Sequence, residues 1–511
     1  MLKRRTGDED ELSIAIIGAG FAGLGMAIQL KQRGMDAFTV FEGGSDVGGT
    51  WRDNTYPGCA CDVPSHLYSF SFERNPDWSC NYSPQEEILA YLRCCADKYR
   101  VRPHIRFDTW IAKASWVEEE KRWRLESGSG YVFFARVLVA GTGPLRTPSL
   151  PDVPGLEEFE GEVMHSARWN HDYDFAGKRV AAVGTGASAI QFVPELAKEV
   201  SDLHLFQRTP PWVLPKIDGA FSDAWKARFR EHPSLTFGFR NLIYWAAELF
   251  GTGFFVDPRV NEWRQKMALR YMAETIEDPA LRAKITPDYV MGCKRVLFSN
   301  DYYPALNRDN VELIDHGVSE IRARSVVAQD GTEREVDAIV FGTGFRVTDF
   351  LTPLEVTGRD GLDLNDAWRD GAEAYLGMTV SGFPNLYILV GPNTGLGHNS
   401  IVFMIEAQVH YVLRCLERME DRKVGALEVK PAALRAFNDR VQERLSSVVW
   451  NTGGCTSWYL DENGKNVTLW PGYTTEYWLR TRRPRWTHYI ERPLPAHVVE
   501  RAPEPLSASM A

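Results

Sequence analysis

The sequence predicts an α/β fold with two Rossmann-like dinucleotide-binding domains and a helical insertion. Two glycine fingerprints, each between an apolar run and a predicted helix, carry this prediction. A pair of Gly-Thr-Gly turns and an aromatic-rich segment support it. At 511 residues the chain is too long for one hydrophobic core. Its net charge of −10 gives no support for nucleic-acid binding.

The first fingerprint follows the apolar run 14–17 and is typical of a strand–turn–helix unit that binds a dinucleotide. Its glycines are Gly18, Gly20 and Gly23, which allow a tight turn and a close approach of helix to strand. The next apolar run, residues 37–41, is followed by Glu42. A carboxylate there accepts hydrogen bonds from a free ribose 2′-hydroxyl, so Glu42 indicates FAD or NAD.

The second fingerprint has the same layout and the opposite charge. After the run 180–183 it consists of Gly184, Thr185, Gly186, Ala187, Ser188 and Ala189. The run 203–207 is followed by Arg208, which lies 24 positions after the first glycine, as Glu42 does in the first unit. A guanidinium pairs with a 2′-phosphate, so Arg208 indicates NADP. A chain with both fingerprints is most simply an NADPH-using flavoprotein.

Two Gly-Thr-Gly turns, residues 141–143 and 342–344, each follow an apolar run, and a Pro-rich linker at 148–154 follows the first. We interpret these turns as the points where the chain leaves one nucleotide domain and returns to it. The predicted order is the first part of the FAD domain (1–145), the first part of the NADP domain (151–215), a helical insertion (216–290), the second part of the NADP domain (291–340) and the second part of the FAD domain (341–511).

The insertion is predicted to be helical because apolar side chains recur there at helical spacing: Leu242, Trp245, Ala246, Leu249 and Phe250. Core packing is the simplest role for any one of its aromatic residues. A wall of a hydrophobic substrate tunnel and a contact with a membrane surface are the alternatives. No apolar run reaches the roughly 18 residues of a membrane span, so no transmembrane segment is predicted.

The eight cysteines show no CxxC spacing. Cys59 and Cys61 form a CxC, and Cys94 and Cys95 are adjacent; neither is a good metal or disulfide pattern. The sequence therefore predicts reduced thiols in a cytoplasmic protein and no metal site.

A further pattern identifies a family. Phe159, Gly161, His165 and Trp169 match FxGxxxHxxxW, and the chain thereby resembles the type I Baeyer–Villiger monooxygenases, within the class B flavoprotein monooxygenases. A second pattern of that family also matches, namely 49–51 (Gly-Thr-Trp), 56–58 (Tyr-Pro-Gly) and Asp62. The stretches 391–400 and 455–459 are most similar to the hydroxyacetophenone monooxygenase branch.

The resemblance implies an NADPH- and O2-dependent flavin monooxygenase that converts ketones to esters or lactones by Baeyer–Villiger oxygen insertion. Oxidation of sulfides is a second activity that it implies. The expected partners are a ketone and molecular oxygen, and no oligomeric state is predicted.

The resemblance also assigns the site. Arg295 is the expected catalytic residue, because a permanent cation stabilises the anionic oxygen nucleophile and the tetrahedral adduct. Asp62 would orient Arg295, with an N-cap of the next helix as the alternative. Lys294 would join Arg208 and Thr209 on the NADP phosphate. By position alone, the residues assigned to FAD are Phe21, Thr50, Trp51, Asp53, Tyr68 and Ile111, and those assigned to NADP are Ala60 and Cys61.

His165 and Trp169 are interpreted as couplers of domain rotation rather than acid–base groups. Trp458 and Trp470 are equally compatible with the core and with the active site.

Three other functions fit parts of the pattern. A flavin-containing monooxygenase that oxidises amines or sulfides needs no cation beside the oxygen, so the Lys294-Arg295 pair argues against it. A disulfide reductase requires a CxxxxC after Glu42, where this chain has Trp51 and no such pair. A catalytically silent NADPH sensor would not need Asp62 and Arg295.

Overall fold

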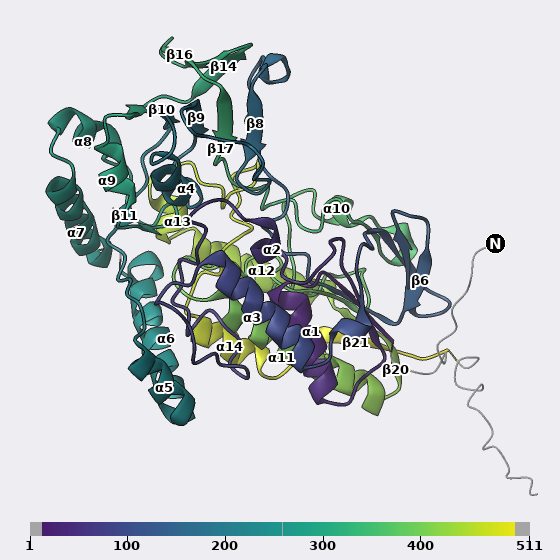
Figure 1. The fold of residues 1–511 in the computed structure, drawn as a ribbon. Coiled ribbons are helices and arrows are strands. Elements are labelled where there is room, and N and C mark those ends of the chain that lie inside the picture. The colour runs from purple at the N-terminus through teal and green to yellow at the C-terminus, as the bar shows by residue number, and fades with distance from the viewer. Residues whose placement is uncertain (1–12, 258, 496–511) are drawn as a thin grey trace, which may run out of the picture.

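The computed structural model describes residues 13–257 and 259–495, and this part of the chain forms an α/β fold around two five-stranded parallel sheets (Figure 1). The first sheet has the order β19-β7-β1-β2-β3. Its strands are β1 (Ile14–Ile17), β2 (Phe38–Phe41), β3 (Ile105–Arg106), β7 (Val137–Ala140) and β19 (Leu386–Ile388). The predicted fold class is therefore confirmed.

The second sheet has the order β13-β10-β9-β17-β8 and is also parallel throughout. Its strands are β8 (Glu162–His165), β9 (Arg179–Val183), β10 (Asp202–Phe206), β13 (Val311–Ile314) and β17 (Ala338–Phe341). All five lie between β7 and β19 of the first sheet in chain order. The second sheet is thus built while the chain is away from the first, although the domain boundaries given above stay predictions.

Both sheets are buried on both faces, as parallel sheets usually are. In β1, Ile14 and Ile16 join the large core that contains the helices, whereas Ala15 and Ile17 face a second core. The second core packs against a four-stranded sheet made of β4 (Ile111–Val117), β5 (Arg122–Ser127), β6 (Val132–Ala135) and β18 (Glu355–Thr357). Strand β9 alternates in the same way between the large core and a third one.

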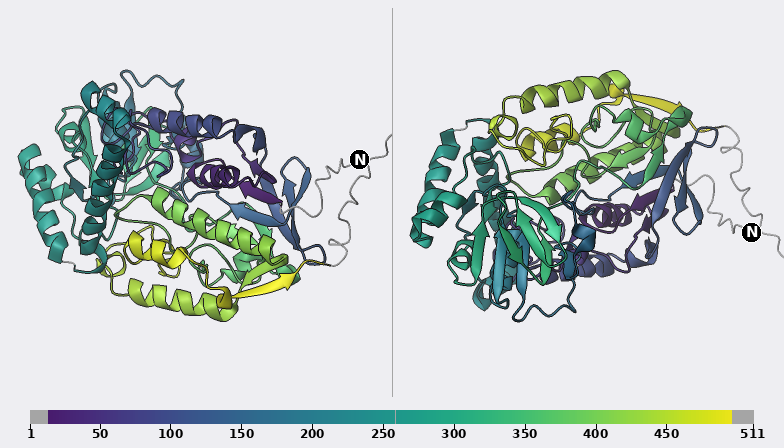
Figure 2. Two further views of the ribbon diagram at one scale, coloured as in Figure 1. Left: turned by 90° about the horizontal axis from the view of Figure 1, so that it is seen from below. Right: turned by 90° about the horizontal axis from the view of Figure 1, so that it is seen from above.

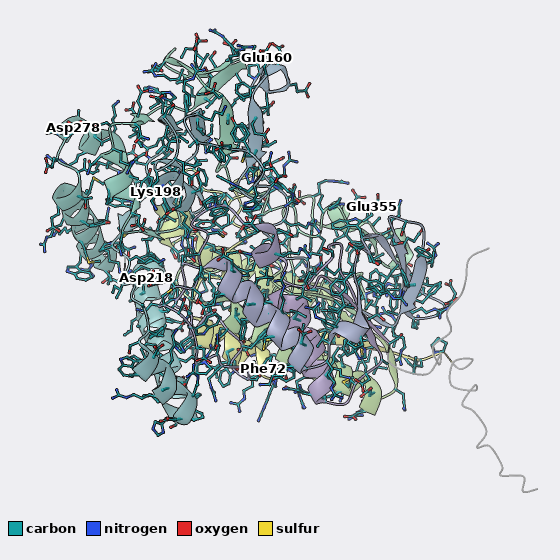
Figure 3. All side chains as sticks on the ribbon, in the orientation of Figure 1. Phe72, Glu160, Lys198, Asp218, Asp278 and Glu355 are labelled. Carbon is teal, nitrogen blue, oxygen red and sulfur yellow. A yellow bond between two sulfur atoms is a disulfide. The ribbon has the colours of Figure 1, made fainter. Side chains whose placement is uncertain are left out.

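Helices cover the first sheet on its other face. Helix α1 (Phe21–Gln32) packs against α3 (Gln85–Lys98) and α11 (Ile401–Asp421). Figure 2 shows these helices side by side, and Figure 3 shows labelled charged side chains such as Glu160 and Glu355 at the periphery. The other helices and turns around the core are α2 (Thr50–Asp53), α4 (Ala189–Leu196), α9 (Tyr302–Leu306), α10 (Leu364–Ala367), α12 (Pro431–Leu445), α13 (Val449–Thr452) and η2 (Leu156–Glu158).

The segment expected to be a helical insertion is helical. It contains α5 (Asp223–Glu231), α6 (Pro233–Phe255), α7 (Arg259–Thr275) and α8 (Pro279–Ile285), on the left of Figure 1. A two-stranded sheet, β11 (Val213–Leu214) with β12 (Leu297–Phe298), joins its two ends. An antiparallel sheet at the outer end of the second unit has β14 (Val318–Arg322), β15 (Ser325–Ala328) and β16 (Glu333–Glu335).

The C-terminal part of the described chain returns to the first unit. Helix α14 (Thr474–Thr481) packs on α11, and β21 (Tyr489–Pro493) pairs antiparallel with β20 (Val424–Val429). The residues beyond 495 lie outside the described part of the chain, as do 1–12.

The prediction that all cysteines are reduced thiols is wrong for one pair. Cys293 and Cys455 form a disulfide across 162 positions of the sequence, with Cα atoms 6.1 Å apart. Spacing rules find neighbouring cysteines and cannot find partners that only the fold brings together. The bond ties the segment before Lys294 to the loop after α13, whereas Cys59, Cys61, Cys80, Cys94, Cys95 and Cys415 are free.

We expect Cys455→Ser to lower the free energy of unfolding by roughly 2–5 kcal/mol, because the bond closes a long loop of the unfolded chain. Thermal unfolding with and without a thiol reductant measures the effect, and the reductant should lower the midpoint of the wild type only. Cys94→Ser is the matched control, since Cys94 is exposed and free. Equal midpoints for wild type and Cys455→Ser would contradict the bond.

Candidate functional site

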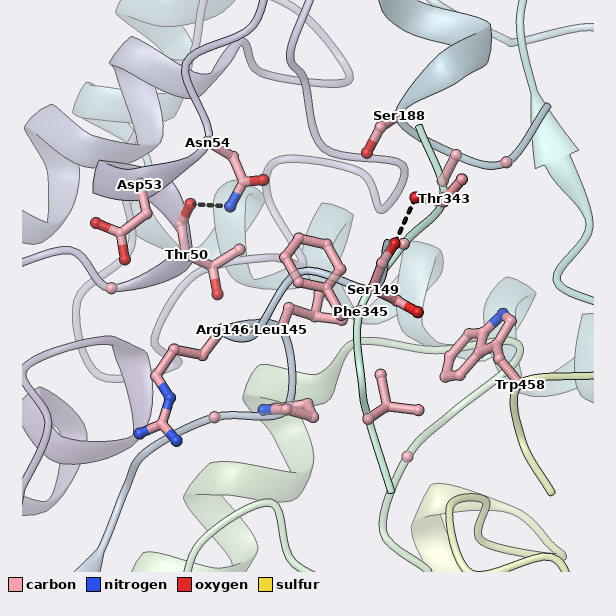
Figure 4. A pocket seen from close by; sticks show the side chains of 18 of the residues that line it. Thr50, Asp53, Asn54, Leu145, Arg146, Ser149, Ser188, Thr343, Phe345 and Trp458 are labelled. Atoms are coloured by element: carbon pink, nitrogen blue, oxygen red, sulfur yellow. Dashed lines mark hydrogen bonds between the residues drawn. The ribbon is translucent and has the colours of Figure 1, made fainter. Parts of the chain in front are cut away.

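A cleft of about 990 Å³ lies where the carboxyl ends of the strands of both sheets meet. All residues assigned above to the cofactors and to catalysis line it, except Gly23 and Ala189. Figure 4 shows part of its wall, where residues of the first unit such as Thr50 and Asp53 lie opposite Ser188 and Thr343 of the second. The fold thus brings the two fingerprints, whose first glycines lie 166 positions apart (184 − 18), to one cavity.

The first fingerprint requires glycine because neighbouring backbone atoms leave no room for a side chain. Gly18 has φ +95°, and a Cβ there would lie 2.6 Å from the carbonyl oxygen of Gly141. A Cβ on Gly23 would lie 1.8 Å from the Gly18 oxygen, so this glycine sets the distance between α1 and β1 rather than the cleft wall. Gly20 faces Gly49 at ordinary contact distance, with 3.6 Å from an added Cβ to the Gly49 Cα. The two glycines leave a bare backbone cradle over the start of α1.

The second fingerprint repeats this geometry. Gly184 has φ +104°, and a Cβ there would lie 2.7 Å from the carbonyl oxygen of Gly342. Gly342 in turn lies close to the methyl group of Ala189, which explains why that residue is small yet outside the cleft. Each Gly-Thr-Gly turn is therefore the partner that a fingerprint glycine packs against, a role that the sequence did not suggest.

Glu42 at the end of β2 is held from three sides. One carboxylate oxygen accepts a hydrogen bond from the Ala19 amide at 2.7 Å, and the other accepts from Gly44 at 2.8 Å. Arg52 donates to that second oxygen at 2.7 Å and also pairs with Asp53. Sequence reasoning did not identify Arg52. The only feature that could have pointed to it is its position next to Trp51 in the family pattern. The network fixes a carboxylate beside the first glycine turn.

Three residues expected around a phosphate lie together on the far side of the cleft. A side pocket of about 340 Å³ is lined by Arg208, Thr209 and Lys294, by the acidic residue Asp288, and by the loop that contains Cys455. Burial and the neighbouring charge of Arg208 lower the pKa of Lys294. Two cations held together in this way favour an anionic ligand, and a phosphate satisfies both. The disulfide closes one wall of this pocket, because Cys293 precedes Lys294.

Arg295 and Asp62 meet in the centre of the cleft. The Nε of Arg295 donates to the Asp62 carboxylate at 2.6 Å, and Nη1 donates to the carbonyl oxygen of Leu396 at 3.3 Å. Both charged side chains are 27% exposed. The segment after Asp62 forms turns and not a helix, so the alternative of an N-cap is wrong. The pair joins positions 233 apart in the sequence.

Each member of this pair stabilises the charge of the other. Burial alone would raise the pKa of Asp62, but the charge of Arg295 and its hydrogen bond lower it below the usual value of 3.8. Burial would lower the pKa of Arg295, and Asp62 outweighs this and raises it. At neutral pH the cleft therefore contains a permanent cation in a fixed orientation.

The residues of the family signature lie outside the cleft wall. His165 ends β8, and its Nδ1 accepts a hydrogen bond from the Ala167 amide at 3.1 Å. Burial lowers its pKa to about 4, so the ring is neutral at pH 7. Trp169 packs on Phe175 and Phe192, and Gly161 lets the Asp337 backbone approach closely, in the same region as Phe159. None of these contacts indicates acid–base chemistry; their coupling role stays a prediction.

Sequence reasoning also missed a direct bridge between the two units. Gln191 of α4 accepts from the Tyr56 hydroxyl at 2.9 Å and donates to the Ala60 carbonyl at 3.0 Å.

The structure distinguishes the two tryptophans that the sequence left open between core and active site. Trp458 is 46% exposed and lines the cleft near Phe345, whereas Trp470 is buried in the core.

The residues present fit two dinucleotides. Each half of the cleft has a glycine turn that a Cβ would fill, at the start of a helix whose free amides favour a pyrophosphate. One half presents Glu42 for a 2′-hydroxyl, and the other presents Arg208 and Lys294 for a 2′-phosphate. This distribution fits FAD in the first half and NADP in the second.

Comparisons with known proteins agree with this geometry. Residues 11–228 match the family described as flavin-binding monooxygenase-like. A Baeyer–Villiger monooxygenase of Streptomyces coelicolor is 51% identical over 97% of this chain and 96% of its own length. Another, from Pseudomonas aeruginosa, is 50% identical over 92% of this chain and 89% of its own. A solved steroid monooxygenase bound to NADP has a TM-score of 0.84 at 30% identity, covering 94% of this chain and 99% of its own.

We expect Asp62→Asn to lower the free energy of unfolding at pH 7 by about 1–2 kcal/mol, since a partly exposed ion pair is replaced by a neutral hydrogen bond. The pKa of Asp62 is lower in the folded state, so the pair stabilises above the usual carboxyl pKa of 3.8 and is lost as the pH falls through the lower folded value. The difference in thermal midpoint from wild type should therefore shrink in acid.

The control is Asp366→Asn, because the Asp366–Arg369 pair is largely exposed and should contribute little. If the two variants had equal effects at pH 7, the Asp62–Arg295 pair would not be a stabilising contact.

Proposed function

The chain belongs to the Baeyer–Villiger monooxygenases, and we propose that it inserts one oxygen atom of O2 beside the carbonyl group of a ketone to give an ester or lactone. It is an FAD-dependent NADPH monooxygenase, as its relatives and its two dinucleotide sites indicate. The observation that carries the proposal is the Arg295–Asp62 pair in the cleft that both fingerprints share.

FAD, when bound, supplies electron transfer from NADPH and the activation of oxygen. The residues that would hold it are the turn from Gly18 to Phe21, the carboxylate of Glu42 and the wall formed by Thr50, Trp51, Asp53, Tyr68 and Ile111. Those that would hold NADP are the turn from Gly184 to Ser188, the cationic group of Arg208, Thr209 and Lys294, and the backbone around Ala60 and Cys61.

Arg295 is proposed as the catalytic cation. An oxygen nucleophile that attacks a ketone carries negative charge, and the carbonyl oxygen gains it as the tetrahedral adduct forms. Arg295 keeps its proton throughout, since Asp62 raises its pKa. Its Nε and Nη1 are held by Asp62 and Leu396, and the remaining N–H groups are free to donate to the developing anion. The charge is thus positioned before the reaction begins and costs no reorganisation.

Asp62 is proposed as the positioning residue for this cation. Without its carboxylate, the guanidinium would keep only the 3.3 Å hydrogen bond to Leu396. Leu396 contacts Arg295 and lines the cleft, so its side chain would help to exclude water from the reacting groups.

None of the helices in the described residues is long and apolar enough to cross a membrane. We propose a cytoplasmic enzyme whose partners are a ketone and O2. Sulfide oxidation, which needs no anionic adduct, would depend less on Arg295.

The decisive test of function measures ester formation from a ketone, together with NADPH consumption, in wild type and Arg295→Ala. We expect ester formation to fall about 10²–10³-fold, because a fixed charge beside a developing oxyanion contributes that much. Reduction of the bound flavin by NADPH without oxygen should change far less. Arg324→Ala is the matched control, since Arg324 is exposed and pairs with Glu160 at the outer end of the second unit. Wild-type ester yields from Arg295→Ala would overturn the assignment of Arg295, whereas a wild type that forms no ester but oxidises a sulfide would favour heteroatom oxidation.

The cofactor preference has a separate test. We expect Arg208→Gln to raise the KM for NADPH about tenfold or more while the KM for NADH changes little, because only NADPH has the 2′-phosphate. Initial rates of oxidation of both nucleotides measure this. An unchanged preference would mean that Arg208 does not bind the phosphate.

A further inference from the structure

Helix α6 lies at the surface of the protein, yet it buries polar side chains and exposes apolar ones. The side chains that it buries are mostly polar: Thr236, Arg240, Tyr244 and Glu248, which recur every four residues on one face. Arg240 donates to the backbone of His66 and Leu67, and Glu248 accepts from Thr474 and Thr475. These polar anchors therefore hold the helix to the body together with apolar side chains on its flank, since Ile243, Ala247, Phe250 and Phe254 pack on the core.

The outer face of α6 is apolar instead. Leu242 is 67% exposed, Trp245 55% and Leu249 71%, at spacings of three and four residues. The only charged residues of this 23-residue helix, Arg240 and Glu248, are both buried. A solvent-facing helix normally has charged residues on that side. Core packing, the simplest role expected for an aromatic residue of this segment, is wrong for Trp245, and an exposed apolar stripe of this kind indicates a binding surface.

Helix α14 packs against the inner face of α6 and adds exposed apolar side chains of its own. Its Thr475 contacts Tyr244 and Glu248 of α6, and Trp478, Leu479 and Arg482 follow at i+3, i+4 and i+7 on the same side. Trp478 and Leu479 are exposed, and the Arg482 guanidinium lies 4.9 Å from the Trp478 ring centroid. The two helices lie beside each other in the view from below (Figure 2, left). We name Leu242, Trp245, Leu249, Trp478, Leu479 and Arg482 the α6–α14 surface.

The edge of this surface at the end of α14 is strongly basic. Residues 478–485 contain four arginines and no acidic residue, in a chain with a net charge of −10. Arg482, Arg483 and Arg485 are exposed, and none of the three pairs with a carboxylate among the described residues. Apolar side chains, tryptophan and unpaired arginines together are the features of a helix that lies in the headgroup region of an anionic membrane.

We propose that the α6–α14 surface docks this enzyme on an anionic lipid bilayer, with the leucines and tryptophans entering the headgroup region and the arginines on lipid phosphates. The acidic remainder of the chain would be repelled by the same membrane, which fixes the orientation of docking. A second copy of the chain fits less well, since a twofold interface would bring each arginine edge close to its own copy.

The test uses the full-length, FAD-loaded protein and its sedimentation with vesicles of phosphatidylcholine mixed with phosphatidylglycerol, or of phosphatidylcholine alone. We expect the wild type to sediment with the mixed vesicles and at least about tenfold less with the neutral ones. Replacing Leu242, Trp245 and Leu249 together by Gln should weaken binding to the mixed vesicles at least about tenfold. Replacing Arg482, Arg483 and Arg485 by Gln should remove the preference for the anionic lipid.

The matched control is Tyr131→Gln, which removes an exposed aromatic side chain next to β6, on the opposite side of the molecule. Flavin content and the thermal midpoint show that each variant is folded. The proposal would be overturned if the α6 variant sedimented with the mixed vesicles as the wild type does. It would also be overturned if the wild type stayed in solution with both kinds of vesicle. If the wild type is a dimer that does not bind vesicles, and the α6 variant is a monomer, the surface would be assigned to a second copy of the chain instead. None of these readouts depends on the reaction.

Discussion

The ion pair between Arg295 and Asp62 is the contact on which the arrangement of the site depends. A cation in a cleft needs a partner, and the carboxylate that satisfies it comes from the other nucleotide-binding unit. Nearby contacts hold the same junction: Gln191 bridges to Tyr56 and Ala60, and the disulfide at Cys293 anchors the segment that presents Lys294 and Arg295. These contacts together hold the two sheets around one cleft in the arrangement that the structure shows.

Charge is sorted within this cleft along its length. A carboxylate fixed by backbone amides stands at one end, a paired cation in the centre, and two cations with a shared side pocket at the other end. The central cation is neutralised by the Asp62 carboxylate, whereas the two cations of the side pocket have Asp288 as the one acidic residue among the described residues that line it. The pKa of Lys294 is lowered by burial and, in addition, by repulsion from the charge of Arg208. A ligand phosphate removes that repulsion, so the electrostatics favour a loaded site over an empty one.

The features that the sequence predicted are those fixed by local backbone geometry or by a family pattern. Gly18 and Gly184 have positive φ and no room for a side chain, so glycine there marks a turn before the fold is known. Asp62 and Arg295 were found through resemblance, because nothing local links positions 233 apart. The Cys293–Cys455 bond and the Gln191 bridge had no such pattern, and only the tertiary structure brings those side chains together.

Helix α6 shows a different limit. Its helical period was predictable, but period alone does not tell which face is buried. The apolar face is normally the inner one because burial of apolar area stabilises the fold. Here the inner face must instead satisfy the amides at the start of α14 and the carbonyls around His66, which requires Glu248 and Arg240. Polar anchors fix the helix, so its leucines and tryptophan remain outside. Such a face persists at a surface only where something apolar meets it, which is the physical basis for a membrane-facing α6.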